Sequence, residues 1–373
     1  MLSTNTLKNS APIDLVMTNV LYPEGGDFEY LCRVSTYVKA FYHCRKNSLW
    51  KSSTQRFEKD MLACCLKIAE AVKQGKYYPK PYQEFNLFER GKPRHIKAPL
   101  IEDRVFVHAL VQDILLPRIR PQLIYDNSAA LKQRGISFAR KRLLTHLHRY
   151  YKETGSNKGY ILQTDFSKFF DSINHDLLCE QLCKYTPDIR VQTIIHRIVD
   201  SFGEVGLGIG SELSQTAGIL FPSKIDNYCK IVKSCKYYAR YMDDIYVIHQ
   251  SKVFLQELFK ELQAIANELK LKFNPKKCHI NRLDKVFTYL KSIYHFTITG
   301  AVICRPSKTC LRRERLKLKR FVRLLNYKKL TLSDIQNAYK SWRGNIIRQY
   351  PKTARAIVRV FDKQFTNLFG ELA

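Results

Sequence analysis

Two adjacent aspartates, Asp243 and Asp244, interrupt a run of aromatic and aliphatic residues that reads KYYARYMDDIYVI over 236–248. The flanks are rich in Tyr, Ile and Val, which favours two strands joined by a tight turn. Burying an unpaired carboxylate costs several kcal/mol, so two of them at one turn are either solvated or held there for chemistry. For the pair taken alone, a solvated acidic turn is the commoner outcome.

A third carboxylate follows another predicted strand. Asp165 comes directly after the apolar segment 160–164 in YILQTDFSKFF. If that strand pairs with the hairpin, Asp165 lies beside Asp243 and Asp244, and three converging carboxylates repel one another unless a cation joins them. Such oxygen ligands suit Mg²⁺ or Mn²⁺, and two ions about 4 Å apart support an in-line displacement at phosphorus. The pattern predicts a metal-dependent site that acts on nucleic acid.

The charge of the chain favours the same partner. Its 373 residues carry 63 Lys or Arg against 33 Asp or Glu, a formal charge of +30. Such a field attracts polyanions, of which nucleic acid is the commonest and an acidic membrane surface the alternative. There is no 18-residue apolar run and no signal-peptide pattern, so we expect a cytoplasmic protein without a membrane partner. Eleven irregularly spaced cysteines favour reduced, mostly buried thiols over disulfides or zinc.

Helical and strand patterns alternate along the chain. Apolar spacing predicts helices within 27–74, over 101–120, from about 174, over 212–230 and over 253–270, and a strand pair around 85–99. This mixture predicts an α+β or α/β fold with several lobes. From residue 301 onward 18 Lys or Arg stand against 4 Asp or Glu, which predicts a separate basic helical lobe. Its expected buried stripe is Leu318, Phe321, Val322 and Leu325, and its expected outer face is Arg312, Arg313, Arg315, Lys319 and Arg320.

Six segments in order resemble the motif series of bacterial reverse transcriptases, the retron and group II intron lineage: GKPRHIKAPLIEDR, TDFSKFFDSI, GIGSELSQ, RYMDD, LKLKFNPKK and FTYLKSI. The Tyr-x-Asp-Asp element alone is a weak signal, but six motifs in the right order are specific. The resemblance implies an α+β right-hand polymerase with fingers, a palm that contains an antiparallel sheet, and a helical thumb. We assign residues 1–300 to fingers and palm and residues 301–373 to the basic helical thumb.

The resemblance also implies roles at the reaction centre. Asp165, Asp243 and Asp244 match the carboxylates that hold two Mg²⁺ ions, for which Mn²⁺ can substitute, and the carbonyl of Phe166 would complete the shell. Lys277 matches a lysine proposed to protonate the pyrophosphate. Its neighbour Lys276 could exchange with it.

Further matches concern the incoming dNTP. Lys92 and Arg94 match fingers residues that hold the triphosphate, although a solvated basic hairpin is the alternative. Phe170 matches an aromatic gate that clashes with a ribose 2′-OH, and either Phe169 or Phe170 must belong to the core. Tyr241 should pack near the primer end.

The sequence departs from the family pattern beside these residues. Ile209 and Gln215 stand where the family has the glutamine of Pro-Gln-Gly and the proline of Ser-Pro, so we place both at the nucleotide site. Ile209 cannot hydrogen-bond over the nascent pair, an exchange that accompanies error-prone synthesis in diversity-generating retroelements. Lys291 replaces the glycine of the primer grip. Similar drift occurs in defence-associated reverse transcriptases, which copy a dedicated non-coding RNA.

The resemblance therefore implies an RNA-directed DNA polymerase that copies a non-coding RNA into cDNA, with antiviral defence favoured over a diversity-generating role. Its partners would be template RNA, a primer or cDNA, and dNTPs, with room for an accessory protein or a homo-oligomer. An alternative from another class is a non-catalytic RNA-binding subunit. A basic regulatory DNA binder would explain the charge but leave the carboxylates unexplained.

Overall fold

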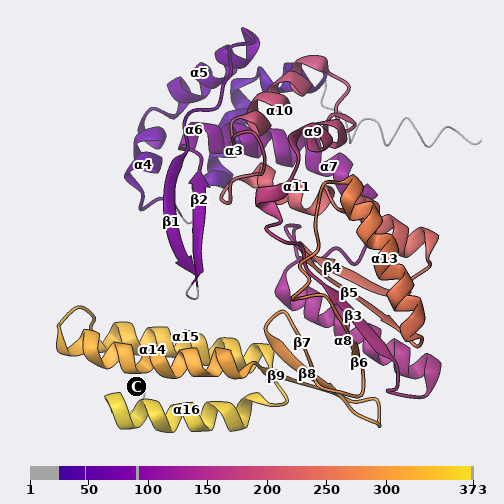
Figure 1. Cartoon of the computed structure of the whole chain (residues 1–373). Coiled ribbons are helices and arrows are strands. Elements are labelled where there is room, and N and C mark those ends of the chain that lie inside the picture. Colours follow the sequence, from indigo (N-terminus) through magenta and orange to yellow (C-terminus); the bar gives the residue numbers. More distant parts are fainter. Residues whose placement is uncertain (1–24, 47, 90–91, 371–373) are drawn as a thin grey trace, which may run out of the picture. The chain divides into compact units, whose positions relative to one another are not determined.

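The computed structural model describes residues 25–46, 48–89 and 92–370 (Figure 1). Contacts divide the chain into two compact units, each built from segments far apart in the sequence. The first unit comprises Met1–Tyr125, Phe166–Asn227 and Ala264–Lys272. The second comprises Asp126–Asp165, Tyr228–Gln263 and Phe273–Ala373.

The first unit is mostly helical. Helix α3 packs on α5 and α6, and aromatic rings fill the space between these elements: the Phe106 ring lies 3.9 Å from that of Tyr77 and 6.0 Å from that of Tyr37. Its helices are α2 (Asp27–Leu31), α3 (Val34–Cys44), α4 (Ser52–Lys59), α5 (Met61–Lys73), α6 (Ile101–Ala109), α7 (Leu116–Ile119), α9 (His175–Cys183), α10 (Ile189–Asp200), α11 (Glu212–Leu220) and α12 (Ser223–Asn227). A π-helical turn (Leu110–Leu115) joins α6 to α7, and 3₁₀ turns cover Arg120–Gln122 and Phe170–Ser172.

A buried ion pair joins helix α2 to helix α7. Asp27 accepts two hydrogen bonds from Arg118, at 2.6 and 2.7 Å, and one from the Thr186 hydroxyl at 2.6 Å. The Asp27 and Arg118 side chains are almost fully buried. The two buried charges therefore compensate each other.

Strands β1 (Gln83–Glu89) and β2 (Lys92–Ala98) form an antiparallel hairpin that projects from these helices (Figure 1). At its base Ile96 pairs in parallel with Ile209, and the Lys97 N–H donates to the Ile209 carbonyl at 3.0 Å. Gly208 has no room for a side chain, because a Cβ there would lie 2.5 Å from the Lys97 Cβ. The hairpin is thus anchored on the Gly-rich segment that carries Ile209.

The second unit contains an antiparallel four-stranded sheet in the order β4-β5-β3-β6 (Figure 1). Its strands are β3 (Tyr160–Thr164), β4 (Tyr237–Tyr241), β5 (Asp244–His249) and β6 (His279–Arg282). Helix α8 (Ile136–Thr154) packs on β4, and its Leu143 and Leu147 share a core with Ile161 and Tyr246. A π-helical turn (Tyr228–Val232) precedes β4, and α13 (Lys252–Glu268) follows β5 and ends among residues of the first unit.

A second sheet, β7 (Phe287–Tyr289), β8 (Ser292–Phe296) and β9 (Val302–Pro306), leads to three helices, α14 (Lys308–Asn326), α15 (Leu332–Gln349) and α16 (Ala354–Phe369). We call these three helices the C-terminal bundle. Leu318 is buried in its core, against which Phe321 and Leu325 pack, whereas Val322 is only partly buried. The five basic residues expected on the outer face of α14 are all exposed, so that prediction is confirmed.

Most other element predictions are confirmed as well. The strand at 160–164, the hairpin at 237–249, and the helices near 174 and 253 all form, whereas the helical stretch predicted over 212–230 is divided into α11, α12 and a π-helical turn. All eleven cysteines lie in the described part and none forms a disulfide there, but only five are buried, so the expectation of mostly buried thiols holds in part. Among the helices of the described residues, none is both long and apolar enough to cross a membrane.

Candidate active site

The strand register brings the carboxylates together. Thr164 of β3 pairs with Ile245 of β5, which places the next residue of β3, Asp165, beside the preceding residue of β5, Asp244. Tyr241 pairs with Asp244 across the hairpin, so Met242 and Asp243 form the turn. The predicted juxtaposition of Asp165 with the hairpin carboxylates is therefore present within the second unit.

Asp165 is held from several sides. Its residue is only 5% exposed, and its Oδ2 accepts a hydrogen bond of 2.6 Å from the Lys277 ammonium. Its carbonyl accepts the Asn274 N–H at 2.8 Å. Its Oδ1 is buried and has no hydrogen-bond partner among the described residues. An acceptor oxygen is thus left for a further cation or donor.

Lys277, rather than Lys276, reaches this carboxylate. Burial would lower the pKa of Lys277, but the hydrogen bond and the charge of Asp165 outweigh it and raise that pKa. Lys276 is exposed, and its backbone N–H donates to the Asn274 side chain. At neutral pH the amine of Lys277 therefore carries its proton.

Asp244 is affected by the other two carboxylates. Burial, followed by the charges of Asp243 and Asp165, raises the pKa of Asp244 to about 7, and Lys277 and Lys291 act in the opposite direction. A carboxyl with such a pKa is near half-protonation at neutral pH. The three carboxylates are therefore close enough to interact electrostatically.

The donor set fits a hard divalent metal ion such as Mg²⁺ or Mn²⁺. In the part of the chain that the structure describes, no three His, Cys, Asp or Glu side chains stand ready in metal-binding geometry. The oxygen chemistry of Asp165, Asp243 and Asp244, the orphaned Oδ1 and the raised pKa of Asp244 all favour a hard cation. Among the described residues, the Lys277 ammonium forms an ion pair with Asp165 at 2.6 Å.

Arg240, which sequence patterns did not single out, supports the hairpin turn. Its residue is fully buried, and its Nη1 donates to the Met242 carbonyl at 3.1 Å. Met242 has φ +54°, a left-handed backbone conformation that residues other than Gly rarely adopt. The backbone of Arg240 bonds that of Asp126 and Ser128, at 3.2 and 2.9 Å.

Asp126, whose backbone bonds Arg240, forms ion pairs with further cationic side chains. Its carboxylate pairs with Arg142 at 2.5 Å and with Lys230 at 2.9 Å. The pKa of Asp126 falls well below its ordinary value: burial would raise it, but His146 and Lys230 outweigh that effect. The only sequence signal for this network is a charged residue, Arg240, inside an otherwise apolar strand.

The candidate nucleotide residues lie in the first unit. Phe169 is buried and stacks on Phe166 with ring centroids 5.4 Å apart, whereas Phe170 is partly exposed. The Phe170 carbonyl accepts the Leu207 N–H at 2.8 Å, which ties it to the segment that leads into Ile209. Of the two phenylalanines, Phe169 is therefore the core residue.

The remaining predicted residues are less closely assembled. Arg94 is exposed and forms an ion pair of 2.7 Å with Glu89. Lys92 begins β2, and its side chain lies outside the described residues. Ile209 is partly buried at the base of the hairpin, and Gln215 is exposed on α11. Their contacts with a nucleotide remain predictions.

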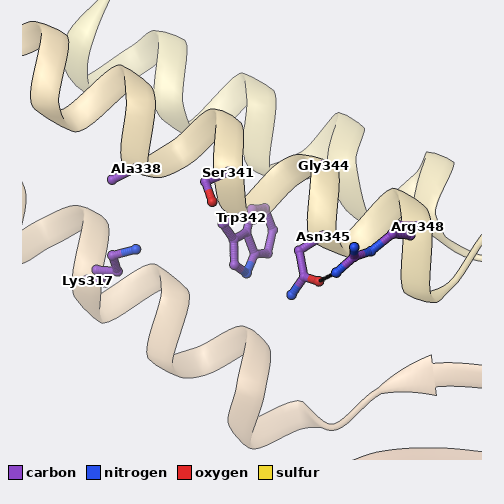
Figure 2. Close-up of a pocket in the computed structure, with 7 residues that line it drawn as sticks. All are labelled: Lys317, Ala338, Ser341, Trp342, Gly344, Asn345 and Arg348. Carbon is purple, nitrogen blue, oxygen red and sulfur yellow. Dashed lines mark hydrogen bonds between the residues drawn. The ribbon is translucent and has the colours of Figure 1, made fainter. Parts of the chain in front are cut away.

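The C-terminal bundle has a hollow of about 510 Å³ between α14 and α15 (Figure 2). Lys317 of α14 lies on one side, and Trp342, Asn345 and Arg348 of α15 lie on the other. Arg348 donates to the Asn345 side chain at 3.3 Å. Cations beside an aromatic ring and amide groups form a surface that suits phosphates and sugars.

The family model for the reverse transcriptase (RNA-dependent DNA polymerase) matches residues 79–294, which is more than half of the chain. The match includes both strand ends that carry the carboxylates, and also Lys277. The chain belongs to the reverse transcriptase family, and its fold is the α+β right-hand polymerase fold.

Similar solved structures include the telomerase of Candida albicans in complex with a fragment of telomeric RNA. It is 11% identical to this chain with a TM-score of 0.47, and the match covers 79% of this chain and 58% of that chain. An apo telomerase of Candida tropicalis, truncated from its C-terminal domain, is 14% identical with a TM-score of 0.44, and the match covers 62% of this chain and 58% of that chain. An insertion-loop deletion mutant of a human picobirnavirus RNA-dependent RNA polymerase is 13% identical with a TM-score of 0.42, and the match covers 65% of this chain and 54% of that chain. The chain thus spans less than two thirds of each protein. A search of curated proteins found no match.

Proposed function

We propose that the chain is an RNA-directed DNA polymerase that extends a primer with dNTPs along an RNA template. The observation that carries this proposal is the meeting of Asp165 and Asp244 at the ends of paired strands, beside Asp243 and with Lys277 bonded to Asp165. Membership of the reverse transcriptase family supports the reaction class.

Asp165, Asp243 and Asp244 would hold two Mg²⁺ ions, or Mn²⁺ in their place, with the Phe166 carbonyl as a further ligand. Such ions, when bound, activate the primer hydroxyl and neutralise the leaving pyrophosphate. The raised pKa of Lys277 keeps its amine protonated, which suits it to donate a proton to that pyrophosphate.

The first unit would hold the nucleotide. Lys92 and Arg94 would bind the triphosphate, and Arg94 would exchange Glu89 for phosphate oxygens. Phe170, which is not committed to the core, would exclude a ribose 2′-OH. Ile209 and Gln215 would lie near the nascent pair, where Ile209 offers no hydrogen bond.

Residues 1–300 would form fingers and palm, and residues 301–373 the thumb. The exposed basic face of α14 supports a grip on duplex phosphates without sequence readout. The hollow between Lys317 and Arg348 would extend that grip (Figure 2). Binding of duplex should weaken steeply with salt, because each neutralised phosphate releases a counterion.

For the biological role we propose a bacterial, cytoplasmic enzyme that copies a dedicated non-coding RNA in antiviral defence. The motif series and the departures at Ile209, Gln215 and Lys291 support a divergent member of the bacterial lineage. Error-prone copying in a diversity-generating retroelement is the second candidate, which the isoleucine at position 209 favours.

The decisive experiment compares the purified protein with its Asp243→Asn variant. With primer, RNA template, dNTPs and Mg²⁺, the unchanged protein should synthesise DNA, and the variant should bind nucleic acid but make none. A protein that binds RNA yet makes no DNA with either metal would instead be a non-catalytic RNA-binding subunit. Sequencing the co-purified RNA and the new DNA would separate the roles: one discrete non-coding RNA supports defence, and errors concentrated opposite one template base support diversification.

A further inference from the structure

Two adjoining hollows lie at the opposite end of the four-stranded sheet from the carboxylates, where β4 begins and β5 ends. The inner one has a volume of about 330 Å³ and the outer one of about 600 Å³. They share Glu153, Lys236 and Tyr237. Because β4 runs from Tyr237 to Tyr241 at about 3.3 Å per residue, this end is roughly 13 Å from the catalytic turn.

Aromatic rings form part of the wall of the inner hollow, beside polar and charged side chains. Tyr237 meets Tyr150 edge-on, with ring centroids 5.7 Å apart. Phe254 lies on another side, with its ring 4.1 Å from that of His249. Ile248 is buried and closes the space. Flat apolar walls with polar atoms at the rim suit a planar, partly polar group such as a nucleobase.

The outer hollow is cationic. The Glu153 carboxylate is already engaged by the Lys236 ammonium and by the Tyr237 hydroxyl. Arg149 and Lys152 are exposed on α8 and have no hydrogen bond or ion pair within the described residues. Within the described residues, these two cations beside the hollow thus form no ion pair with an anionic side chain.

We propose that the two hollows together bind one unpaired nucleotide of an RNA strand. Its base would lie against Tyr237 and Phe254, and its flanking phosphates would contact Arg149 and Lys152. The site would anchor a segment of RNA away from the catalytic turn. The choice of RNA as ligand rests on the proposed function. The aromatic lining favours RNA over an acidic peptide, because a peptide carboxylate would use only the cations.

The test uses the full chain, with the polymerase channel filled by a saturating primer–template duplex. The probe is an oligouridine of about 12 nucleotides, a length within the range that single-strand sites cover. One variant carries Arg149→Glu with Lys152→Glu. The matched control carries Lys141→Glu with Lys285→Glu, two exposed lysines that do not line the hollows.

We expect the first variant to bind the probe on the order of tenfold more weakly than the control, and its salt slope to fall by roughly 1.4 for two lost phosphate contacts. Tyr237→Ala should weaken binding roughly 5- to 150-fold, the range of base stacking, and Tyr237→Phe should largely restore it. A 4-thiouridine probe should crosslink to peptides of α8, β4 or the start of α13.

Equal binding by the two double variants, or crosslinks confined to other segments, would overturn the proposal. So would displacement of the probe by oligoglutamate or oligodeoxyuridine as readily as by RNA, which would assign the site to a protein or to DNA. DNA synthesis on the added duplex reports separately on the proposed function. Synthesis without a crosslink rejects the nucleotide site alone, and a crosslink without synthesis rejects the polymerase alone.

Discussion

Replacing Lys277 by Gln tests whether the carboxylates depend on a cation for their stability. The Lys277 Nζ lies 2.6 Å from the Asp165 Oδ2, and the lysine side chain is half exposed whereas that of Asp165 is buried. A hydrogen bond to a charged group contributes about 1.5 to 3 kcal/mol, and solvent screening at the lysine places this one at the lower end. In EDTA we expect the free energy of unfolding of the second unit to fall by about 1.5 kcal/mol. This change raises the equilibrium constant for unfolding roughly tenfold.

Tryptophan fluorescence during urea unfolding can measure this change. The chain has two tryptophans, and Trp342 lies in the second unit while Trp50 lies in the first, so a Trp50→Phe background makes the signal specific. In saturating Mg²⁺ the loss should shrink, because a divalent ion supplies the positive charge that the lysine gave. Lys276→Gln is the matched control. The reasoning is refuted if both lysine variants lose the same stability, or if Mg²⁺ leaves the loss unchanged.

Three further predictions each concern the replacement of a single residue. Asp27→Asn removes the carboxylate that pairs with the buried Arg118 guanidinium, so urea unfolding followed by Trp50 should show a loss of about 3 to 5 kcal/mol, and a loss under 1 kcal/mol would contradict this. Lys328→Gly should stabilise the C-terminal bundle by about 1 kcal/mol in the Trp342 signal, since Lys328 follows α14 at φ +53°, where glycine has no steric cost. Because the pKa of Asp244 is raised to about 7, stability in EDTA should fall as pH rises from about 4 to 7, and Asp244→Asn should flatten that profile; an unchanged profile would show that Asp244 is not the group responsible.

Strand pattern and motif order were enough to predict the core of the candidate site. A run of five mostly apolar residues ending at Asp165 indicated a strand, and the hairpin flanks indicated two more. β3 pairs with β5 in antiparallel orientation, with Thr164 opposite Ile245, so the end of β3 meets the start of β5. The prediction therefore needed only local pattern and one pairing.

The choice between neighbouring residues could not be predicted in this way. Lys276 and Lys277 are equivalent in sequence, and Phe169 and Phe170 are nearly so. Lys277 reaches Asp165 because the Asn274 N–H bonds the Asp165 carbonyl and fixes the register of the loop. Phe169 is buried because its ring stacks on Phe166, and such packing depends on the assembled core.

The turn that carries Asp243 also depends on buried contacts that no local sequence pattern describes. Met242 at φ +54° carries a cost of roughly 1 to 2 kcal/mol relative to an ordinary strand residue. The hydrogen bond from the buried Arg240 guanidinium to the Met242 carbonyl offsets that cost, since bonds from charged donors contribute about 1.5 to 3 kcal/mol. The backbone of Arg240 is itself paired with Asp126, whose carboxylate is held by Arg142 and Lys230. A turn supported from within the unit holds its carboxylates in place, so under the proposed function less reorganisation would remain for the reaction itself.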